Sequence, residues 1–452
     1  MNKKPNILFI TTDQQSREMM SCAGNRYVST PAMDSLATRG TRFTRTYCTN
    51  PICVPSRFSL FTGRMPSEIK LQGNGPVGVP EIPDDIKKTG LGWTLKHGGY
   101  RAVYAGKQHF PKMNAEDLGF DVLTEDERDE LADVTAQFVS QPQDEPWCLV
   151  ASFINPHDIC YMALDDYEKR GPEQKDKGAG SVPLDELKRA LDSAQKFPED
   201  EFFENHCPPL PPNFEPQQDE PEAFQALLEK RKFRIHARQN WGEREWRMHR
   251  WAYARLTERV DGQIQVLLDA LKSGPACDDT IIIFTSDHGD HDSSHQMEHK
   301  TVPYEEAAGV PLIICQPGGP TGAVNDTTLI SNGLDLYPTI CDYAGIDVPA
   351  HIDGKSLRPL VDGQERDAPR PTVKIEMEVG NAIVSDSHKY VKCFKGERAE
   401  QLYDLQNDPH ETRNSAHDPD QQDALVLHRR YFAKSFPGHA GDDPLRGIPL
   451  PL

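Results

Sequence analysis

Residues 280–288 read Thr-Ile-Ile-Ile-Phe-Thr-Ser-Asp-His, an apolar run that ends in polar residues. The six residues Thr280–Thr285 are β-branched or aromatic, which is typical of a strand. A strand without polar alternation is buried on both faces, as in a parallel sheet that helices cover on both sides. The run therefore predicts an α/β fold in which Asp287 and His288 follow the carboxyl end of a buried strand.

Similar short runs alternate with helical patterns along the chain. Further strands are expected at 6–12, 101–105, 147–154 and 311–315, and helices at 30–39 and 246–271. Thr30 is expected to cap the first of these helices, and Pro31 lies in its first turn. The alternation predicts a large, mostly parallel sheet sandwiched by helices, in which ligands bind beyond the carboxyl ends of the strands.

Two parts of the chain depart from this pattern. Residues 158–240 are rich in Pro, Asp, Glu and Lys, and we interpret them as an insertion that shapes the substrate pocket. Short strands separated by turn residues follow Pro359 and predict a small antiparallel sheet. We therefore expect a catalytic domain over residues 1–360 and a C-terminal subdomain over 361–452.

Composition excludes several classes of protein. The 452 residues include 50 Lys and Arg against 70 Asp and Glu, a net charge of −20, which argues against nucleic-acid binding. No segment approaches the ~18 apolar residues of a membrane span. Ten cysteines without a CxxC pair are expected to be mostly buried thiols. The first strand begins at Asn6, too early for a leader, so the sequence as written predicts a cytoplasmic protein, or a periplasmic or secreted one if a leader was removed.

Acidic residues follow two of the expected strands, Asp13 with Gln14 and Asp287 with His288. Isolated residues of this kind are more often helix caps or turn residues, but the dense run 287–292 favours a cation site. His291, His295 and His299 recur at four-residue spacing and would suggest zinc on a helix. Glycine and serine residues between them make a regular helix unfavourable.

A cysteine precedes another expected helix. In Cys53-Val54-Pro55-Ser56-Arg57 the proline marks the first turn, so Cys53 would lie at a helix N-terminus, which favours an anion. The cysteine is either a thiolate nucleophile or a buried structural residue.

This segment, followed by Thr62-Gly63-Arg64, resembles the C-x-P-S-R…T-G-R signature of the type I, formylglycine-dependent sulfatases of the alkaline phosphatase superfamily. Four more stretches match motifs of that family in the same order. They are the first strand with Asp13-Gln14, Gly106-Lys107-Gln108-His109, Pro156-His157, and Thr285-Ser286-Asp287-His288-Gly289 with Lys300. The insertion 158–240 matches no motif.

The resemblance implies that a formylglycine-generating maturation enzyme oxidises Cys53 to formylglycine, whose hydrate attacks the sulfur and later expels sulfate. It also implies a divalent cation bound by Asp13, Gln14, Cys53, Asp287 and His288. Many relatives carry Asp at the position of Gln14 and Asn at that of His288. We expect calcium, while the added nitrogen makes manganese an alternative.

The remaining motif residues receive roles through the same resemblance. Lys107 and Lys300 would bind the sulfate as point charges, and Arg57 would fix the formylglycine. His109 would act as the base on the hydrated aldehyde, and His157 would act as general acid or sulfate ligand.

The resulting hypothesis is a sulfuric ester hydrolase that acts on a sulfated carbohydrate. The negative charge of the chain opposes capture of long polyanions, so a monosaccharide or short oligosaccharide is expected. Two alternatives stay open, a phosphonate monoester or phosphodiester hydrolase of the same superfamily and a non-catalytic sulfatase-like binding protein. Neither nucleic acid nor a membrane is expected as a partner.

Overall fold

The main sheet is mixed but mostly parallel. This computed structural model describes residues 4–71, 73–74, 79, 81–170, 181–364 and 370–438, and within them the sheet has eight strands in the order β5-β4-β6-β1-β7-β8-β2-β9. Their bounds are β1 Asn6–Asp13, β2 Thr41–Phe43, β4 Arg101–Gly106, β5 Asp121–Thr124, β6 Trp147–Pro156, β7 Thr280–Ser286, β8 Leu312–Cys315 and β9 Ala323–Asn325. The five strands from β5 to β7 are parallel, and β8 runs antiparallel to both neighbours.

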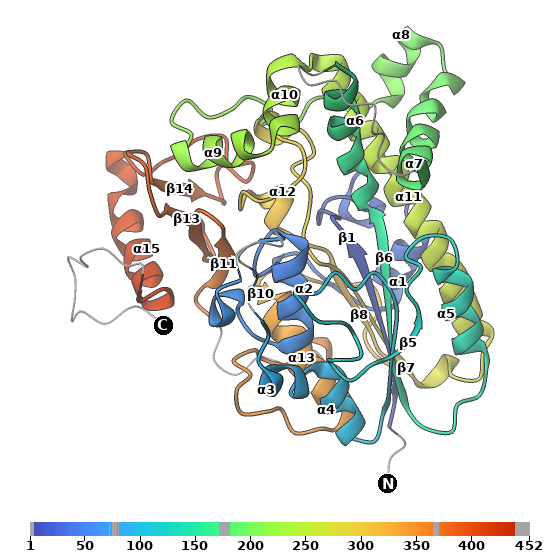
Figure 1. Cartoon of the computed structure of the whole chain (residues 1–452). Helices are drawn as coiled ribbons and strands as arrows, with labels where there is room; N and C mark the ends of the chain where they lie inside the picture. The colour runs from blue at the N-terminus through green and yellow to red at the C-terminus, as the bar shows by residue number, and fades with distance from the viewer. Residues whose placement is uncertain are drawn as a thin grey trace.

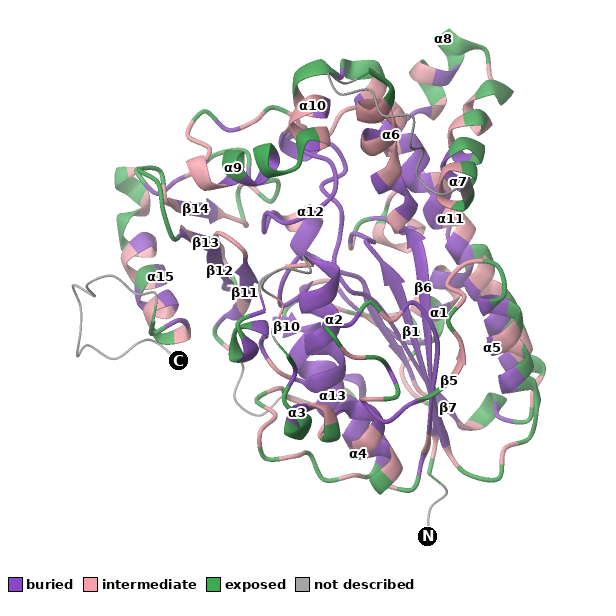
Figure 2. Cartoon of the chain, in the orientation of Figure 1, coloured by how far each residue is buried: buried purple, intermediate pink, exposed green. Residues whose placement is uncertain are grey.

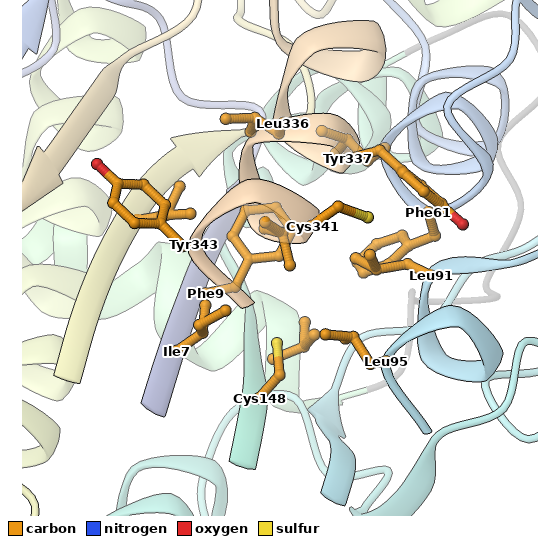
Figure 3. Packing of buried hydrophobic residues seen from close by; sticks show 14 of the residues in the cluster. Ile7, Phe9, Phe61, Leu91, Leu95, Cys148, Leu336, Tyr337, Cys341 and Tyr343 are labelled. Atoms are coloured by element: carbon orange, nitrogen blue, oxygen red, sulfur yellow. The ribbon is translucent and has the colours of Figure 1, made fainter. Parts of the chain in front are cut away.

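Helices cover both faces of this sheet, as predicted (Figure 1). Successive residues of β1 point to opposite faces, so Ile7 and Phe9 pack in one apolar cluster while Leu8 and Ile10 pack in another. Figure 3 shows Phe9 facing Phe61 and its neighbours in the first cluster. The first face is covered by α2 (Cys53–Thr62), α4 (Leu91–His97) and α13 (Asn332–Ala344). The second is covered by α1 (Pro31–Arg39), α5 (Leu131–Ser140) and α11 (Glu243–Ser273).

Helix α1 begins where the sequence predicts, but its cap differs from the prediction. Thr30 occupies the cap position without a capping hydrogen bond from its side chain, and its hydroxyl instead accepts from the Ser21 amide at 2.9 Å. The Asp261 carboxylate of α11 accepts from the amides of Ala32 and Met33 at 3.0 and 2.9 Å. The first turn of α1 is therefore capped by Asp261, a residue distant in sequence, and not by Thr30 as predicted.

The insertion is helical and lies beyond the carboxyl end of the sheet (Figure 1). Its helices are α6 Cys160–Arg170, α7 Ser181–Asp192, α8 Glu199–Glu201, α9 Glu222–Lys230 and α10 Lys232–Asn240, with a π-helical turn at Phe202–His206. Helix α6 follows β6 almost directly, and α10 packs against it. Trp241 and Trp246 lie 4.9 Å apart between their ring centroids and pack with Ala163 and Ala237, so this tryptophan-rich stretch has a packing role.

A second, antiparallel sheet forms near the C-terminus, as predicted. Its strands are β11 Val373–Met377, β12 Gly380–Val384, β13 His388–Cys393 and β14 Glu400–Asp404, paired in that order. Helix α15 (Gln422–Ser435) covers one face, and the other packs against Tyr47, Phe224 and Tyr304. The predicted C-terminal subdomain extends into residues 439–452, which lie outside the described part of the chain.

Short elements connect these layers: α3 Asp84–Lys88, α12 Glu305–Ala308, α14 Arg358–Val361, and the strand pair β3 Thr46–Tyr47 and β10 Ile330–Ser331. The inner strands of the main sheet and helix α2 are mostly buried, whereas the edge strands β5 and β9 are partly exposed. The outer sides of the insertion and of α15 are exposed (Figure 2). Within the described residues, each helix lacks either the length or the apolar character needed to span a membrane.

Candidate active site

Four parallel strands deliver polar side chains to one edge of the main sheet. Asp13 ends β1, Lys107 follows β4, His157 follows β6 and Asp287 follows β7. Cys53 is the first residue of α2, which is buried throughout and packs over the same sheet. The predicted convergence at the carboxyl end of the sheet is therefore present, and Cys53 lies within it.

Arg57, one turn into α2, connects these strand ends. Its guanidinium donates to Asp287 Oδ2 at 2.8 Å, Asp13 Oδ2 at 3.0 Å, Ser152 Oγ at 2.8 Å and the Lys107 carbonyl at 3.1 Å. The side chains of Arg57 and both aspartates are fully buried. The planar fork of arginine can serve several acceptors at once, so one side chain links four strands, β1, β4, β6 and β7, to α2.

The chain turns sharply between β4 and Lys107. Gly106 has a left-handed φ of 91°, and a Cβ atom there would lie 2.3 Å from the Ser152 carbonyl oxygen. Only glycine fits this close approach. The turn brings Lys107 Nζ to 2.7 Å from Asp13 Oδ2.

Asp13, Cys53, Asp287 and His288 form a compact group of candidate metal ligands. One ligand atom from each of the four lies within 4.8 Å of the others. His288 Nε2 is 3.1 Å from Cys53 Sγ, and Cys53 Sγ is 3.8 Å from Asp13 Oδ1. Burial and the nearby charge of Asp13 raise the pKa of Asp287 to about 6. Two carboxylates and an imidazole at this spacing fit a divalent cation, which would relieve the repulsion between the two aspartates.

The pocket stabilises negative charge at the position of Cys53. Burial and the charge of Asp13 oppose the thiolate, but Lys300, Lys107 and His288 outweigh them and hold the pKa of Cys53 well below its usual range. Burial likewise disfavours ionised Asp13, yet Lys107, His157 and Arg57 hold its pKa well below the usual value. The buried cluster therefore favours negative charge at Cys53, although the chain as a whole is acidic.

Gln14 and Lys300 belong to a second part of the site. Lys300 Nζ donates to Gln14 Oε1, which also accepts from the Cys160 thiol at 3.0 Å, and Gln14 Nε2 donates to Asp290 Oδ2 at 2.5 Å. The backbone amide of Gln14 donates to Asp287 Oδ1 at 3.1 Å. Gln14 thus touches the metal-ligand group through its backbone, and metal binding by its side chain stays a prediction.

The two predicted catalytic histidines occupy different environments. His157 is partly buried near Cys53, and burial together with the charges of Lys107 and Lys300 lowers its pKa to about 4. His109, in contrast, has an exposed side chain and a φ of 45° in the loop after β4. The structure does not bring His109 into the buried cluster, so its role as a base remains a prediction.

The zinc hypothesis for the histidine run finds no support in the structure. His291 and His295 pack around Tyr304 with centroids 6.0 and 4.0 Å away, while His299 packs on Phe233 at 5.0 Å. Positive φ angles at His295 and His299 exclude a regular helix. Among the described residues, the group around Asp13 is the only one with metal-ligand spacing.

No sequence pattern predicted that three further residues belong to the site: Ser152, Cys160 and Asp290. Ser152 lies inside the predicted strand β6 and contacts Arg57, while Cys160 belongs to the insertion. Asp290 lies in the noted acidic run, but no pattern indicated that it would bind Gln14 rather than a metal ion.

Comparison with known families shows to which family the chain belongs. The sulfatase family model matches residues 5–346. The chain belongs to the sulfatase family. A model of the C-terminal region of N-sulphoglucosamine sulphohydrolase matches residues 293–431 of this sulfatase. The resemblance found in the motifs is therefore confirmed, and with it the alkaline phosphatase-like fold.

Individual relatives and structures agree with this assignment. The sulfatase is 29% identical to a Δ4,5-hexuronate-2-O-sulfatase of Bacteroides thetaiotaomicron over 94% of its own length and 88% of that protein. The structure of a 2-O glycosaminoglycan sulfatase matches with a TM-score of 0.81 and 28% identity, covering 99% of this chain and 95% of that one. A phosphonate monoester hydrolase of Agrobacterium radiobacter shares the fold, with a TM-score of 0.72, 21% identity and 96% coverage of both chains.

Proposed function

We propose that this sulfatase removes a sulfate ester from a mono- or short oligosaccharide, with formylglycine formed from Cys53 as its nucleophile. The observation that carries the proposal is the position of Cys53. It lies in the first turn of α2, within contact of Asp13 and His288 and under the charges of Lys107 and Lys300. A sulfate monoester carries one negative charge, which such a pocket would bind.

A divalent cation would complete the site. Asp13, Asp287 and His288, with the residue at 53 and Gln14, would hold it, and calcium is our first choice. When bound, the cation would supply positive charge to the nucleophile and to a sulfate oxygen. The largely oxygen donor set favours calcium, whereas the imidazole of His288 leaves manganese as the alternative.

Other side chains of the site would bind the sulfate, position the nucleophile and transfer protons. Lys107 and Lys300 would hold the sulfate oxygens from two sides, and Arg57 would keep the nucleophile and both aspartates in place. His157 is neutral at neutral pH in the free protein, so it would bind sulfate through a ring N–H, and a role as general acid would require the bound ester to raise its pKa. His109 would act as the base, provided that its loop approaches when substrate binds.

Substrate class is inferred from the relatives and from charge. The hexuronate-2-O-sulfatase and the 2-O glycosaminoglycan sulfatase described above are named for sulfated uronate and glycosaminoglycan substrates. The net charge of −20 would repel a heavily sulfated polymer, which favours short saccharides with few sulfates. A formylglycine-generating enzyme is the expected maturation partner.

A panel of defined sulfated mono- and disaccharides, with released sulfate as the readout, tests the proposal. We expect release from at least one saccharide, and complete loss in a Cys53→Ala variant that unfolds at the same temperature. Mass spectrometry of the peptide containing Cys53 should show a loss of about 18 Da, the exchange of a thiol for an aldehyde. Full activity of the Cys53→Ala variant would overturn the mechanism.

A second candidate is phosphonate monoester or phosphodiester hydrolysis. Gln14 and His288 are compatible with that branch of the superfamily, of which a member shares this fold. Comparing kcat/KM for an aryl sulfate with that for an aryl phosphonate discriminates between the two reactions. A larger value for the phosphonate would favour the second candidate, and no turnover of either by formylglycine-containing protein would favour a binding protein.

A further inference from the structure

One buried arginine of the insertion has no ion-pair partner among the residues that the structure describes. Arg234 of α10 is only 9% exposed, yet among the described residues no carboxylate lies within ion-pair distance of its guanidinium. Its Nη1 donates to Thr301 Oγ1 at 3.2 Å, and no described residue accepts a hydrogen bond from its Nε. Arg238, one turn further along α10, is paired by contrast with both oxygens of Glu220 at 2.8 and 2.9 Å.

The two carboxylates that act on the pKa of Arg234 are each bound to another residue. Glu378 acts on the pKa of Arg234, but its carboxylate is ion-paired with Lys230. Asp290 also acts on it, but its carboxylate accepts from Gln14. Burial lowers the pKa of Arg234 to about 10, so the guanidinium still carries its charge at neutral pH.

Arg234 lies beside the part of the pocket that holds Lys300. Its hydrogen-bond partner Thr301 is the next residue after Lys300. Burial and the charges of Arg234 and Lys300 together lower the pKa of His299, so both cations act on the same ring. Lys300 in turn contacts Gln14 and Cys160 at the catalytic edge of the sheet. The guanidinium is therefore displaced from the sulfate pocket toward the insertion.

A buried charge without a partner destabilises the fold, and an anion that fills the gap offsets this cost. The planar fork of arginine suits an oxyanion such as a carboxylate or a sulfate. Because Arg234 lies on α10 and contacts the residue next to Lys300, an anion bound there would lie between Lys300 and the insertion.

We propose that Arg234 binds a second anionic group of the substrate, carried by the same saccharide as the sulfate ester that is cleaved. This inference rests on the proposed function, since it assumes that the scissile sulfate binds at Lys107 and Lys300. The second group is a uronate carboxylate or another sulfate, which share the chemistry that Arg234 recognises. Arg234 thus selects dianionic saccharides over monoanionic ones.

Binding measurements on a variant without the nucleophile test the proposal independently of turnover. The titrated proteins are Cys53→Ala, Cys53→Ala with Arg234→Gln, and Cys53→Ala with Arg231→Gln, which removes an exposed arginine at the start of the same helix. The probes form two pairs. One pair is a uronic acid 2-sulfate and its methyl ester, and the other is glucosamine 2-N,6-O-disulfate and N-acetylglucosamine 6-sulfate, whose amide is neutral.

We expect the Cys53→Ala protein to prefer the dianionic member of one pair by about 10- to 100-fold, the range for a charge-assisted hydrogen bond. Arg234→Gln should reduce this preference to less than about 3-fold, and Arg231→Gln should leave it unchanged. The pair that shows the preference identifies the group as carboxylate or sulfate. Arg234→Lys, which keeps the charge but loses the fork, should retain part of the preference.

Three outcomes would overturn the proposal: equal affinity within both pairs, a preference that survives Arg234→Gln, or no binding of any probe. Thermal unfolding of each variant shows whether it is folded, and Arg234→Met, which keeps the aliphatic stem, replaces the glutamine variant if that one unfolds. The result of the hydrolysis panel does not depend on the result of these binding measurements. A protein that binds the dianion through Arg234 but releases no sulfate would refute the proposed function and leave the binding assignment intact.

Discussion

Lys107 Nζ lies 2.7 Å from Asp13 Oδ2, although the two residues follow strands that β6 separates in the sheet. The lysine is only 6% exposed, and the aspartate is fully buried. Of the nearby positive charges, Lys107 lowers the pKa of Asp13 most. It also helps to lower the pKa of Cys53. One lysine therefore links the metal-ligand group to the anion site.

This link predicts the behaviour of Lys107→Met, which keeps the length of the side chain but removes its charge. Without the lysine, both the sulfate and the ionised form of Asp13 lose a partner. We expect kcat/KM for an aryl sulfate to fall by about 10²- to 10³-fold, the usual effect of removing one transition-state contact. The fold should persist because Arg57 still pairs with Asp13.

Lys96→Met serves as the matched control for Lys107. Lys96 forms an ion pair with Asp121 on the surface, and such pairs contribute about 1 kcal/mol or less to stability. It should leave kcat/KM unchanged. If Lys107→Met kept activity within a few-fold of wild type, Lys107 would not bind the sulfate.

Arg57→Met should affect stability more than any surface arginine variant. Removing the guanidinium leaves Asp13 and Asp287 buried without their shared partner, which costs about 3–5 kcal/mol. Urea unfolding in a chelating buffer measures this loss. Saturating calcium should recover part of it, because a bound cation would neutralise the same two carboxylates.

Arg398→Met gives the corresponding surface comparison. Arg398 and its partner Glu222 are 43% and 42% exposed, so the expected loss is below about 1 kcal/mol. A loss for Arg57→Met no larger than that of Arg398→Met would contradict the central position that we assign to Arg57.

Metal preference should depend on His288. We expect chelation to abolish sulfate release and to lower the melting temperature, and added calcium or manganese to reverse both effects. His288→Asn exchanges a nitrogen ligand for an oxygen ligand, so the ratio of the two dissociation constants should shift toward calcium by about tenfold, or about 1.4 kcal/mol. Calorimetric titration of each ion into chelated protein measures the ratio. An unchanged ratio would show that His288 does not contact the cation.

Much of the fold and part of the site could be predicted because the relevant signals are local. The strands that carry Asp13, Lys107 and Asp287 are short apolar runs, and parallel strands place their carboxyl ends at one edge. The Cys53 segment was predictable from its proline and from the resemblance. These features need no knowledge of distant contacts.

Other features could not be predicted because they arise from contacts between distant segments. The cap of α1 comes from Asp261 on α11, and Cys160 contacts Gln14 because only one short 3-10 turn separates α6 from the end of β6. The helices of the insertion are short and depend on tertiary packing, which weakens any sequence pattern. The exposed position of His109 likewise depends on the path of a loop, which the motif around Lys107 does not determine.

The last prediction concerns the buried ionic cluster that joins the C-terminal sheet to α12. Lys389 Nζ of β13 lies 2.8 Å from Glu305 Oε1 and 2.9 Å from Glu411 Oε1, and Lys389 and Glu411 are fully buried. Burial opposes ionisation of both acids. Lys389 and Arg17 nevertheless lower the pKa of Glu305 to about 2, whereas burial and the charge of Glu305 raise that of Glu411 to about 8 despite Lys389.

The two glutamates should therefore respond to pH in opposite ways. The contribution of Glu305 to stability is present above its ordinary pKa of about 4.3 and is lost as the pH falls toward 2. That of Glu411 is complete below about 4.3 and is lost as the pH rises toward 8. Glu411→Gln mimics the protonated acid, so its free energy of unfolding should exceed that of wild type increasingly between pH 5 and pH 8. Glu305→Gln should be less stable than wild type at pH 7, because Arg17 loses its ion-pair partner and Lys389 keeps only Glu411, which must then ionise. Urea unfolding of the three proteins across this pH range tests both predictions. If the stability of wild type rose relative to that of Glu411→Gln as the pH increased, the raised pKa assigned to Glu411 would be wrong.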